Sequence, residues 1–262
     1  MSGTTNEDLG RIQEQFRRQA EAYERLAVVA DSAGHRALVA LTQPSERDRV
    51  LDVACGPAFL SMAFAERSAE VVGVDGTDVF LDHARREAGR GGLANLRLLL
   101  GDVERLPLAA AKFDRVVCRA AFHHFPRPRA VLAEMVRVAA PGAKLLIADL
   151  VGSEDPAKAA LHDEIERLCD PTHVRALGES EFDRLFAEQR LRVVFRGRSK
   201  IDYTVREWMS HGGPSPDRAR AIEDKMRASI DGDRAGLFVR EEAGQLAFSH
   251  TGVAFLLERS GT

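Results

Sequence analysis

Cysteine is scarce in this sequence, and long apolar runs are absent. The three cysteines, Cys55, Cys118 and Cys169, lie far apart and form no C-x-x-C pair, which argues against a disulfide framework or a structural zinc site. No segment approaches the roughly 20 apolar residues that a membrane helix requires, and the polar N-terminal residues contain no signal-peptide core. We therefore expect a cytoplasmic protein with no bound metal and no membrane contact.

A strong charge of one sign is also absent. The formal net charge of the 262 residues is -3, so we expect no general attraction to nucleic acid or to acidic membranes. Apolar residues make up 45% of the chain, which supports a sizeable core, and the length suits one α/β domain with an added cap. Only five of the 37 basic residues are Lys. This preference for Arg, with abundant Ala, indicates a GC-rich, bacterial coding sequence.

The most informative stretch is residues 49–60. The run 50–53 predicts a short buried strand, and Asp52 interrupts that run just before a turn of small residues at positions 54–56. Pro57 suits the first turn of a following helix, because its missing N–H costs nothing there. A strand, a tight turn and a helix start together predict a ligand site, since small side chains let a ligand approach the backbone.

Two acids indicate which ligand binds there. The dinucleotide fingerprint G-x-G-x-x-G places its acid about 20 residues after an uncharged turn, whereas Asp52 would repel a pyrophosphate and attract an ammonium or sulfonium group. Asp75 ends the next apolar run, where an acid accepts hydrogen bonds from ribose hydroxyls in related folds. A ribose and a positive centre without a pyrophosphate describe S-adenosylmethionine. The alternative for Asp52 alone is a helix N-cap, and a nicotinamide-linked dehydrogenase is disfavoured.

Apolar runs and helical patterns alternate from residue 49 to residue 149. Such alternation predicts an α/β fold with a doubly wound, mostly parallel, Rossmann-like sheet that has helices on both faces. Asp52, Asp75, Asp102 and Asp149 each fall at or near the end of a predicted strand. Because ligands bind at the carboxyl ends of the strands in such sheets, we expect these acids to share one site.

Several segments resemble, in order, the motifs of class I S-adenosylmethionine-dependent methyltransferases. Residues 52–58 resemble their motif I, usually written D/E-x-G-x-G-x-G, with Ala54 and Ala58 in place of the first and third glycines. Each alanine adds one methyl group, which is tolerable where φ is negative. Residues 74–75, 101–107, 113–118 and 141–147 resemble four later motifs. The resemblance runs from about residue 16 to residue 150 and most favours the ubiquinone/menaquinone-type small-molecule methyltransferases.

This resemblance implies the organisation of the chain and its cofactor residues. It implies a seven-stranded methyltransferase sheet with an N-terminal helical lid (1–43), a cofactor-binding core (44–150), and a substrate cap with terminal strands (151–262). The acids above and the family motifs place the cofactor against one set of residues. The set comprises Tyr23, Asp52, Ala54, Gly56, Pro57, Asp75, Gly76, Phe80, Asp102, Val103, Arg119 and Ala120.

Two aromatic residues of the first predicted helix lie on its apolar face. Residues 16–23 loosely match the F-x-x-x-A-x-x-Y segment that closes over the site in the resembled family. We therefore expect Phe16 to contact the acceptor, and Tyr23 to contact the cofactor and act in catalysis. The alternative is a helix that only docks on the core.

The loop after the fourth predicted strand offers a general base. In the resembled fold this loop passes beside the methionine end of the cofactor, and here it contains His123 and His124. An imidazole with an ordinary pKa near ~6.5 could accept a phenolic or enolic proton. Two adjacent histidines rarely both face a pocket, so we assign His124 to base catalysis and to the acceptor. His123, the second catalytic candidate, is assigned to packing beneath the loop. Catalysis mainly by positioning is the alternative.

The C-terminal part is expected to form the acceptor pocket. Residues 170–175 resemble a D-P-S-H-V-R stretch of some of these methyltransferases, which implies that His173 and Arg175 line the pocket. Tyr203, Trp208 and Met209 could form an aromatic wall there, with core packing as an equal alternative.

One predicted helix carries His162, Asp163 and Glu166, and His173 follows it. Residues four apart share a helix face, so these side chains could form a metal cluster. Because charged residues on a helix usually form its solvated face, we favour that interpretation and predict no metal.

Together these features predict an enzyme that transfers a methyl group from S-adenosylmethionine to O or C of a small molecule and releases S-adenosylhomocysteine. The acceptor is expected to be an aromatic or polyketide-like secondary metabolite. One alternative is an S-adenosylmethionine-binding enzyme of the same fold that catalyses a non-methylating reaction such as a cyclisation. Another is a non-catalytic binding module. No nucleic acid partner is expected, and association as a homodimer is left open.

Overall fold

The computed structural model describes residues 32–259, and one mixed sheet runs through them. Seven strands follow the order β3-β2-β1-β4-β5-β8-β6, and the short β7 pairs with β8 as an eighth. Strands β1 to β5 are parallel, whereas β8 runs antiparallel to β5, β6 and β7. The strands are β1 (Arg49–Val53), β2 (Glu70–Asp75), β3 (Leu96–Leu100), β4 (Phe113–Arg119), β5 (Ala139–Val151), β6 (Leu191–Thr204), β7 (Arg240–Glu242) and β8 (Gln245–Arg259).

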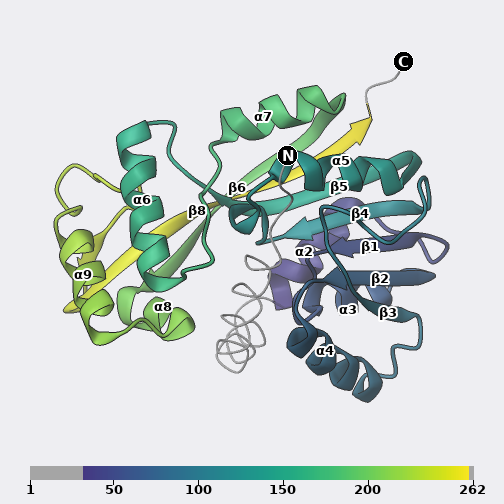
Figure 1. The fold of residues 1–262 in the computed structure, drawn as a ribbon, viewed down its shortest axis with the longest axis horizontal. Coiled ribbons are helices and arrows are strands. Elements are labelled where there is room, and N and C mark those ends of the chain that lie inside the picture. The colour runs from purple at the N-terminus through teal and green to yellow at the C-terminus, as the bar shows by residue number, and fades with distance from the viewer. Residues whose placement is uncertain (1–31, 260–262) are drawn as a thin grey trace.

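Helices alternate with the parallel strands, as the sequence pattern predicts. Those of the described range are α2 (Ser32–Thr42), α3 (Phe59–Ala65), α4 (Asp78–Arg90), α5 (Pro128–Val138), α6 (Pro156–Cys169), α7 (Glu179–Glu188), α8 (Val205–Gly212) and α9 (Pro216–Arg227), with the 3-10 turn η1 (Phe122–His124). The predicted doubly wound α/β fold is confirmed, and β7 is an addition to its seven strands (Figure 1).

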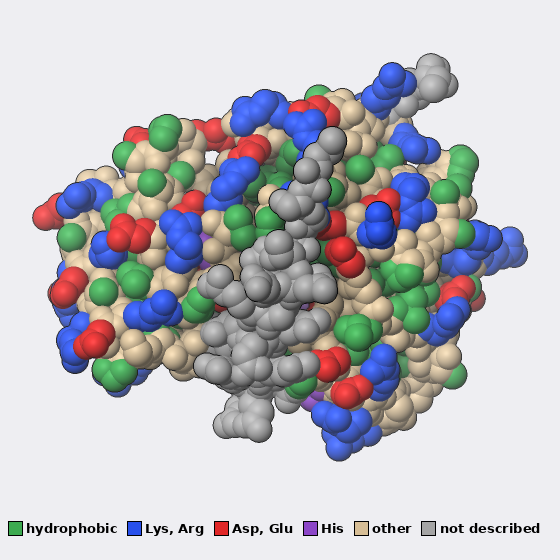
Figure 2. All heavy atoms as spheres, in the orientation of Figure 1, with side chains coloured by type: hydrophobic (Ala, Val, Ile, Leu, Met, Phe, Trp, Pro, Cys, Tyr) green, Lys and Arg blue, Asp and Glu red, His purple; other side chains and the backbone are tan. Residues whose placement is uncertain are grey.

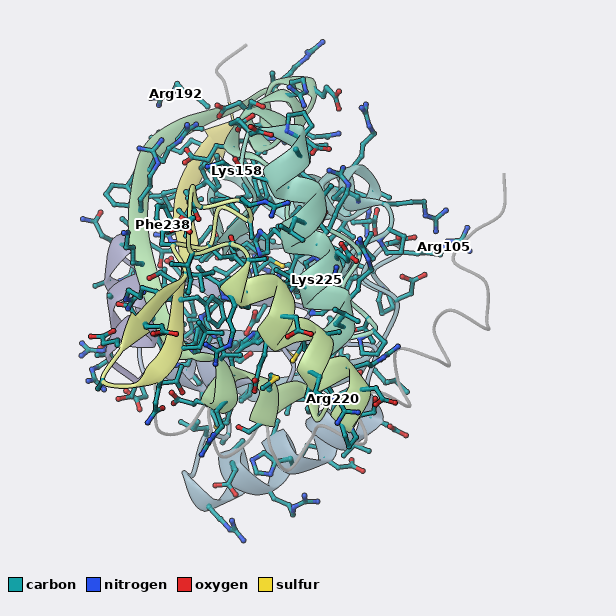
Figure 3. The ribbon with its side chains drawn as sticks, turned by 90° about the vertical axis from the view of Figure 1, so that its left-hand side faces the viewer. Arg105, Lys158, Arg192, Arg220, Lys225 and Phe238 are labelled. Atoms are coloured by element: carbon teal, nitrogen blue, oxygen red, sulfur yellow. The ribbon has the colours of Figure 1, made fainter. Side chains whose placement is uncertain are left out.

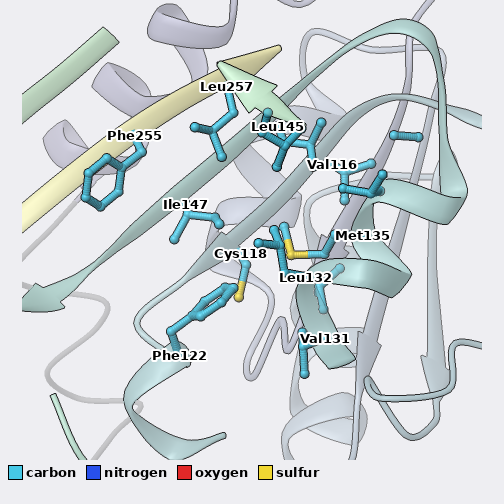
Figure 4. Close-up of a cluster of buried hydrophobic side chains, with 14 of the residues drawn as sticks. Val116, Cys118, Phe122, Val131, Leu132, Met135, Leu145, Ile147, Phe255 and Leu257 are labelled. Atoms are coloured by element: carbon cyan, nitrogen blue, oxygen red, sulfur yellow. The ribbon is translucent and has the colours of Figure 1, made fainter. Parts of the chain in front are cut away.

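The two faces of the sheet bury different apolar side chains. Helices α5 and α7 cover one face, where Val116, Leu145 and Phe255 pack into the largest buried cluster (Figure 4). Helices α2 and α3 cover the other face, where the neighbouring residues Val117 and Leu146 are buried. Successive strand residues point to opposite faces. Central strands that are covered on both sides therefore consist of continuous apolar residues, and the acids stand out where these runs end.

The long strands β6 and β8 extend beyond the parallel strands. Figure 1 shows α6, α8 and α9 gathered around their far ends, and we call these helices, β7 and the strand ends the cap. Its separate buried cluster includes Ile165 from α6, Trp208 from α8 and Phe248 from β8. On the outer side, Lys225 of α9 pairs with Glu164 of α6 at 2.8 Å (Figure 3). Because the cap shares β6 and β8 with the sheet, the strand register fixes its position.

Acidic and basic side chains are interspersed over the face of the molecule that Figure 2 shows. This mixture agrees with the net charge of -3 and gives that face no extended field of one sign. Among residues 32–259, no helix combines the length and the apolar character that a membrane span requires.

The turn after β1 differs from the prediction in its backbone. Helix α3 begins at Phe59 and not at Pro57, because Ala58 has φ 61° and ψ 28°, a left-handed conformation. Ala54 also has a positive φ of 56°. The condition under which the two added methyl groups are tolerated without strain, a negative φ, is therefore not met at either alanine. A left-handed conformation costs a residue with a Cβ about 1–2 kcal/mol, so the turn keeps a glycine-type shape at an energetic cost.

Ala54→Gly should therefore stabilise the protein. Glycine removes the left-handed strain, and its greater freedom in the unfolded chain offsets only about 0.4–1 kcal/mol of the gain. We expect the free energy of unfolding, measured by urea titration, to rise by up to about 1 kcal/mol. Ala63→Gly, inside α3, is the matched control and should lower it by about 1 kcal/mol. Equal losses in the two variants would contradict strain at Ala54.

Candidate functional site

A cavity of about 360 Å³ lies at the carboxyl ends of the parallel strands and continues to the cap. Its volume falls within the range of small-molecule pockets, about 300–1,000 Å³. Residues that follow β1, β2, β3 and β4 line one part, and residues of α6, α8, β6 and β8 line the other. Every predicted cofactor residue of the described range lies along this cavity: Asp52, Ala54, Gly56, Pro57, Asp75, Gly76, Phe80, Asp102, Val103, Arg119 and Ala120.

Asp75, the last residue of β2, holds two backbone segments together. Its Oδ2 accepts the N–H of Gly56 at 2.8 Å, and its Oδ1 accepts the N–H of Thr77 at 2.8 Å. Burial raises the pKa of the Asp75 carboxyl, although these N–H groups oppose the rise. The carboxylate fixes the turn after β1 beside the end of β2, and it lies along the cavity.

Asp52, near the end of β1, is almost completely buried. The Ser61 hydroxyl on α3 donates to its Oδ2 at 2.6 Å. Burial raises the pKa of Asp52 to about 7; the charge of Asp75 adds to the rise, while Ser61 and Arg119 oppose it. Near neutral pH this carboxyl is therefore ionised in part of the molecules and protonated in the others. A cation in the cavity would favour the ionised form.

Asp149 in β5 is the buried acid that holds the loop after β4. Its Oδ2 accepts the N–H groups of Ala121 at 2.8 Å and Phe122 at 2.7 Å, and its Oδ1 accepts the N–H of Leu150 at 2.9 Å. The sequence indicates that Asp149 lies at the end of a strand. No local pattern predicts that the loop folds back onto this side chain, because Ala121 and Phe122 are 28 and 27 positions away from Asp149.

His123 completes this arrangement and lines the cavity. Its Nδ1 lies 2.6 Å from Oδ1 of Asp149. Because a carboxylate only accepts hydrogen bonds, Nδ1 carries the proton and Nε2 is the acceptor of the neutral ring. Burial acts to lower the pKa of His123, but the charge and hydrogen bond of Asp149 outweigh it and raise the pKa. Conversely, burial acts to raise the pKa of Asp149, and His123 outweighs it and lowers the pKa.

His123 is therefore not confined to packing beneath the loop, as was predicted, because it also lines the cavity. His124 also lies along the cavity, but in a different environment. Its Nδ1 donates to the Thr172 carbonyl at 3.2 Å, and its ring centroid lies 4.2 Å from that of His123. Burial, followed by the charge of His123, lowers the pKa of His124 to about 4. His124 is therefore neutral near pH 7 and is a weaker base than His123.

His173 and Arg175, which were predicted to line the acceptor pocket, do not lie along this cavity. The His173 ring lies 5.7 Å from that of His123, and its Nε2 lies 2.8 Å from Oδ1 of Asp163. Arg175 pairs with Glu181. The segment instead supports the loop after β4, because the N–H groups of positions 174 and 175 both reach the carbonyl oxygen of His123.

The cap supplies an aromatic wall to the cavity. Tyr203 and Trp208 lie along it, as predicted, and both rings also pack against Phe248. Both alternatives are therefore found, because the two side chains line the cavity and also pack with the buried cluster of the cap. Met209, the third predicted member, does not line the cavity and packs against the buried cluster of the cap. The cavity beside these rings is also lined by residues that were not among the predicted site residues, namely Glu166, Cys169 and His250.

The charged face of α6 is not solvated, contrary to the prediction. His162 and Glu166 are only 2% and 6% exposed. They are buried because β8 crosses this face and places Nε2 of His250 2.7 Å from Oε1 of Glu166. Asp163 points elsewhere, toward His173. A pairing between residues 84 positions apart has no local signal in the sequence.

The structure describes only part of the predicted N-terminal segment, from residue 32 onward. Phe16 and Tyr23 lie outside the described residues, and their contacts stay predictions. Helix α2 brings His35 to the cavity, where its ring stacks on that of Phe59 with the centroids 6.4 Å apart. No motif in the sequence indicates this role for His35.

Similarity to known proteins extends over most of the chain. The profile of the family described as "Methyltransferase domain" matches residues 44–190. The chain is 29% identical over 216 residues to the uncharacterized methyltransferase YcgJ of Bacillus subtilis, a match that covers 82% of this chain and 85% of that protein. The crystal structure of that YcgJ protein superposes with a TM-score of 0.80 at 26% identity, covering 87% of this chain and 100% of that chain.

A second relative matches a shorter region. Over 142 residues the chain is 37% identical to a demethylmenaquinone methyltransferase of Deinococcus radiodurans, and this match covers 52% of this chain and 58% of that protein. Nearly half of each protein therefore lies outside the match.

Asp149→Asn should destabilise the protein within a defined pH window. Because the pKa of His123 is raised, its contribution is complete below about pH 6.5 and is lost as the pH rises through the folded-state value. Because the pKa of Asp149 is lowered, its contribution is complete above about pH 4 and is lost as the pH falls through the folded-state value. Between these limits the loss should be on the order of 3 kcal/mol, and it should be smaller near pH 9.

Urea unfolding of the parent and the variant at about pH 5.5 and about pH 9 measures this difference. The control is Asp82→Asn, which removes an exposed acid that pairs with Arg85 at 2.7 Å. Since exposed pairs contribute little, this variant should lose less than about 1 kcal/mol at either pH. A loss in Asp149→Asn that is the same at both pH values would contradict the ion pair.

Proposed function

The chain belongs to the class I S-adenosylmethionine-dependent methyltransferases, and we propose that it methylates an oxygen or a carbon of a small aromatic or polyketide-like metabolite. Its cofactor is S-adenosylmethionine and its acceptor is a small molecule. One observation carries the finer proposal. A single cavity joins the acids at the strand ends to aromatic residues of the cap, and a carboxylate-supported histidine, His123, lies along it.

The residues at the strand ends fit the cofactor. S-adenosylmethionine carries a ribose diol, an adenine ring and a positively charged methionine end. Asp75 offers the lone pairs of a buried carboxylate to the hydroxyls, and Phe80 and Val103 offer apolar surface to the adenine. Asp52 offers a negative charge to the cation, and Asp102 an acceptor to the adenine amino group. The two buried carboxylates would repel a pyrophosphate, which supports this cofactor over a dinucleotide.

The proposed mechanism combines positioning with proton removal. When bound, S-adenosylmethionine supplies an electrophilic methyl group on a good leaving group, so orientation of the acceptor provides much of the acceleration. His123 removes the proton of the acceptor hydroxyl through Nε2. Asp149 holds the ring in the tautomer that makes Nε2 the acceptor, and its charge stabilises the imidazolium that forms.

The cap favours an aromatic acceptor. Tyr203 and Trp208 give the cavity ring surfaces on which a planar molecule can stack, and a T-shaped contact of 5.3 Å to Phe248 fixes Trp208. The relative from Deinococcus radiodurans is named for demethylmenaquinone. Both points support phenols and quinols as the first acceptors to test.

Binding of S-adenosylmethionine should strengthen as the pH rises through about 7. Since Asp52 has a pKa of about 7 in the free protein, a cationic ligand must displace its proton at lower pH. We expect the affinity at about pH 6 to be roughly tenfold lower than at about pH 8, with proton release at the lower pH. Calorimetry in two buffers of different ionisation enthalpy measures both quantities.

Two variants test whether Asp52 causes this dependence. Asp52→Asn should weaken binding and abolish the pH dependence, because it cannot ionise. Asp102→Asn, an exposed acid of the same cavity, should keep the dependence because Asp52 is intact. A pH dependence that survives in Asp52→Asn would assign the proton to another group.

The reaction itself is tested by product mass. With S-adenosylmethionine and a panel of phenols and quinols, an acceptor should gain one methyl group as S-adenosylhomocysteine forms. His123→Gln should lower turnover by roughly 10²–10⁴ with little change in cofactor affinity. The rate of the parent should rise with pH through a value above about 6.5, because the base must be neutral and Asp149 raises the pKa of His123.

A base and a purely structural histidine give different pH profiles. Asp149→Asn should move the rising limb of the profile to lower pH, because the imidazolium loses its carboxylate partner. His124→Gln, the neighbouring comparison, should cause a smaller loss than His123→Gln. A pH-independent rate with a fully active His123→Gln would instead assign catalysis to positioning by the cap. An acceptor converted without gain of mass would support the non-methylating alternative.

A further inference from the structure

Three buried side chains converge where α6 meets β8. His162 and Glu166 are four residues apart on α6, so they share a face of the helix, and His250 reaches them from β8. Nε2 of His250 lies 2.7 Å from Oε1 of Glu166, and Nε2 of His162 lies 3.5 Å from the same oxygen. One nitrogen or oxygen atom from each of the three residues lies within 4.8 Å of the other two.

The described residues leave part of this cluster unsatisfied, although His250 already pairs with Glu166. The side chains of His162, Glu166 and His250 are 3%, 8% and 6% exposed. Nε2 of His162 is buried without a hydrogen-bond partner. An unsatisfied buried polar atom is destabilising, and a buried carboxylate requires a compensating positive charge. A divalent cation between the three side chains would meet both requirements.

We propose that His162, Glu166 and His250 bind a divalent first-row transition metal ion, with Zn²⁺ as the representative. Two imidazoles and one carboxylate form a ligand set of catalytic zinc sites, and imidazole favours such ions over Mg²⁺ and Ca²⁺. Bond lengths of about 2.0–2.2 Å place tetrahedral ligand atoms about 3.3–3.6 Å apart. The present separations, from 2.7 Å to at most 4.8 Å, bracket this value, so small side-chain rotations suffice.

The position of the cluster beside the cavity would allow the ion to bind the acceptor. Glu166 and His250 line the cavity, and His162 does not. A fourth coordination position opposite His162 would therefore face the cavity, beside Tyr203 and Trp208, whose rings lie 5.7 and 6.3 Å from that of His250. There the ion would bind an oxygen of the acceptor and fix its orientation, as a Lewis acid that also lowers the pKa of a hydroxyl. This role rests on the proposed methyl transfer, whereas binding of the ion does not.

Titration of the full chain, without an affinity tag and stripped of metal, tests the site in the absence of any acceptor. Calorimetry should show one Zn²⁺ ion bound per chain, and Co²⁺ should give the visible d–d absorption of a four- or five-coordinate site. Glu166→Gln, which keeps the size of the side chain, should weaken binding of both ions by roughly 100-fold or more. Glu164→Gln is the matched control, because Glu164 lies on the same helix but is 53% exposed and pairs with Lys225. This control should bind both ions as the parent does.

Failure of the parent chain to bind Zn²⁺ and Co²⁺ would overturn the proposal, whatever the variants do. Binding that is unchanged in Glu166→Gln would also overturn it. If circular dichroism shows that Glu166→Gln does not fold, the NMR signals of the parent's imidazoles provide the test. Addition of Zn²⁺ must then shift the rings of His162 and His250, and must leave that of His83 on α4 unchanged. S-adenosylmethionine binding is measured on the same samples, so its loss with metal binding intact would count against the proposed function alone.

Discussion

The candidate site depends on the hydrogen bonds that the buried carboxylate of Asp149 accepts. This carboxylate accepts hydrogen bonds from the N–H groups of Ala121, Phe122 and Leu150 and from the ring of His123. Four donors surround one buried group, so its loss would leave several of them without a partner in a low-dielectric interior. The segment 170–176, between α6 and α7, attaches to the carbonyl of His123. The same carboxylate therefore indirectly positions the chain that leads out of the cap.

The buried acids at the other strand ends support the backbone or a neighbouring helix and also line the cavity. Asp75 joins the turn after β1 to the end of β2 through the N–H of Gly56, and that turn keeps Ala54 and Ala58 in left-handed conformations. Asp52 receives one hydroxyl hydrogen bond, and with a pKa of about 7 its charge is not fully stabilised by the protein. A positively charged ligand would complete what the folded chain provides only in part.

The part of the cavity at the strand ends could be predicted because its signals are local. A strand, a small-residue turn and an acid at the strand end occur within about ten residues, and parallel strands bring such ends together. The different environments of His123 and His124 could not be predicted, because that of His123 depends on Asp149, 26 positions away. The cluster on α6 was misjudged for a similar reason, since burial of Glu166 depends on the course of β8. The positive φ of Ala54 has no signal in the residue itself, because alanine favours a negative φ.

Strand β8 couples the two halves of the molecule. Phe255 belongs to the main core beneath α5 and α7, Phe248 belongs to the cluster of the cap, and His250 lies against Glu166. A one-residue slip of β8 would turn every one of its side chains to the opposite face. Packing of Phe255 in the main core therefore also fixes the groups that β8 presents to the end of the cavity beside the cap. Substitutions within α8 or α9 can change this end of the cavity without moving the strand ends, whereas substitutions along β8 alter both.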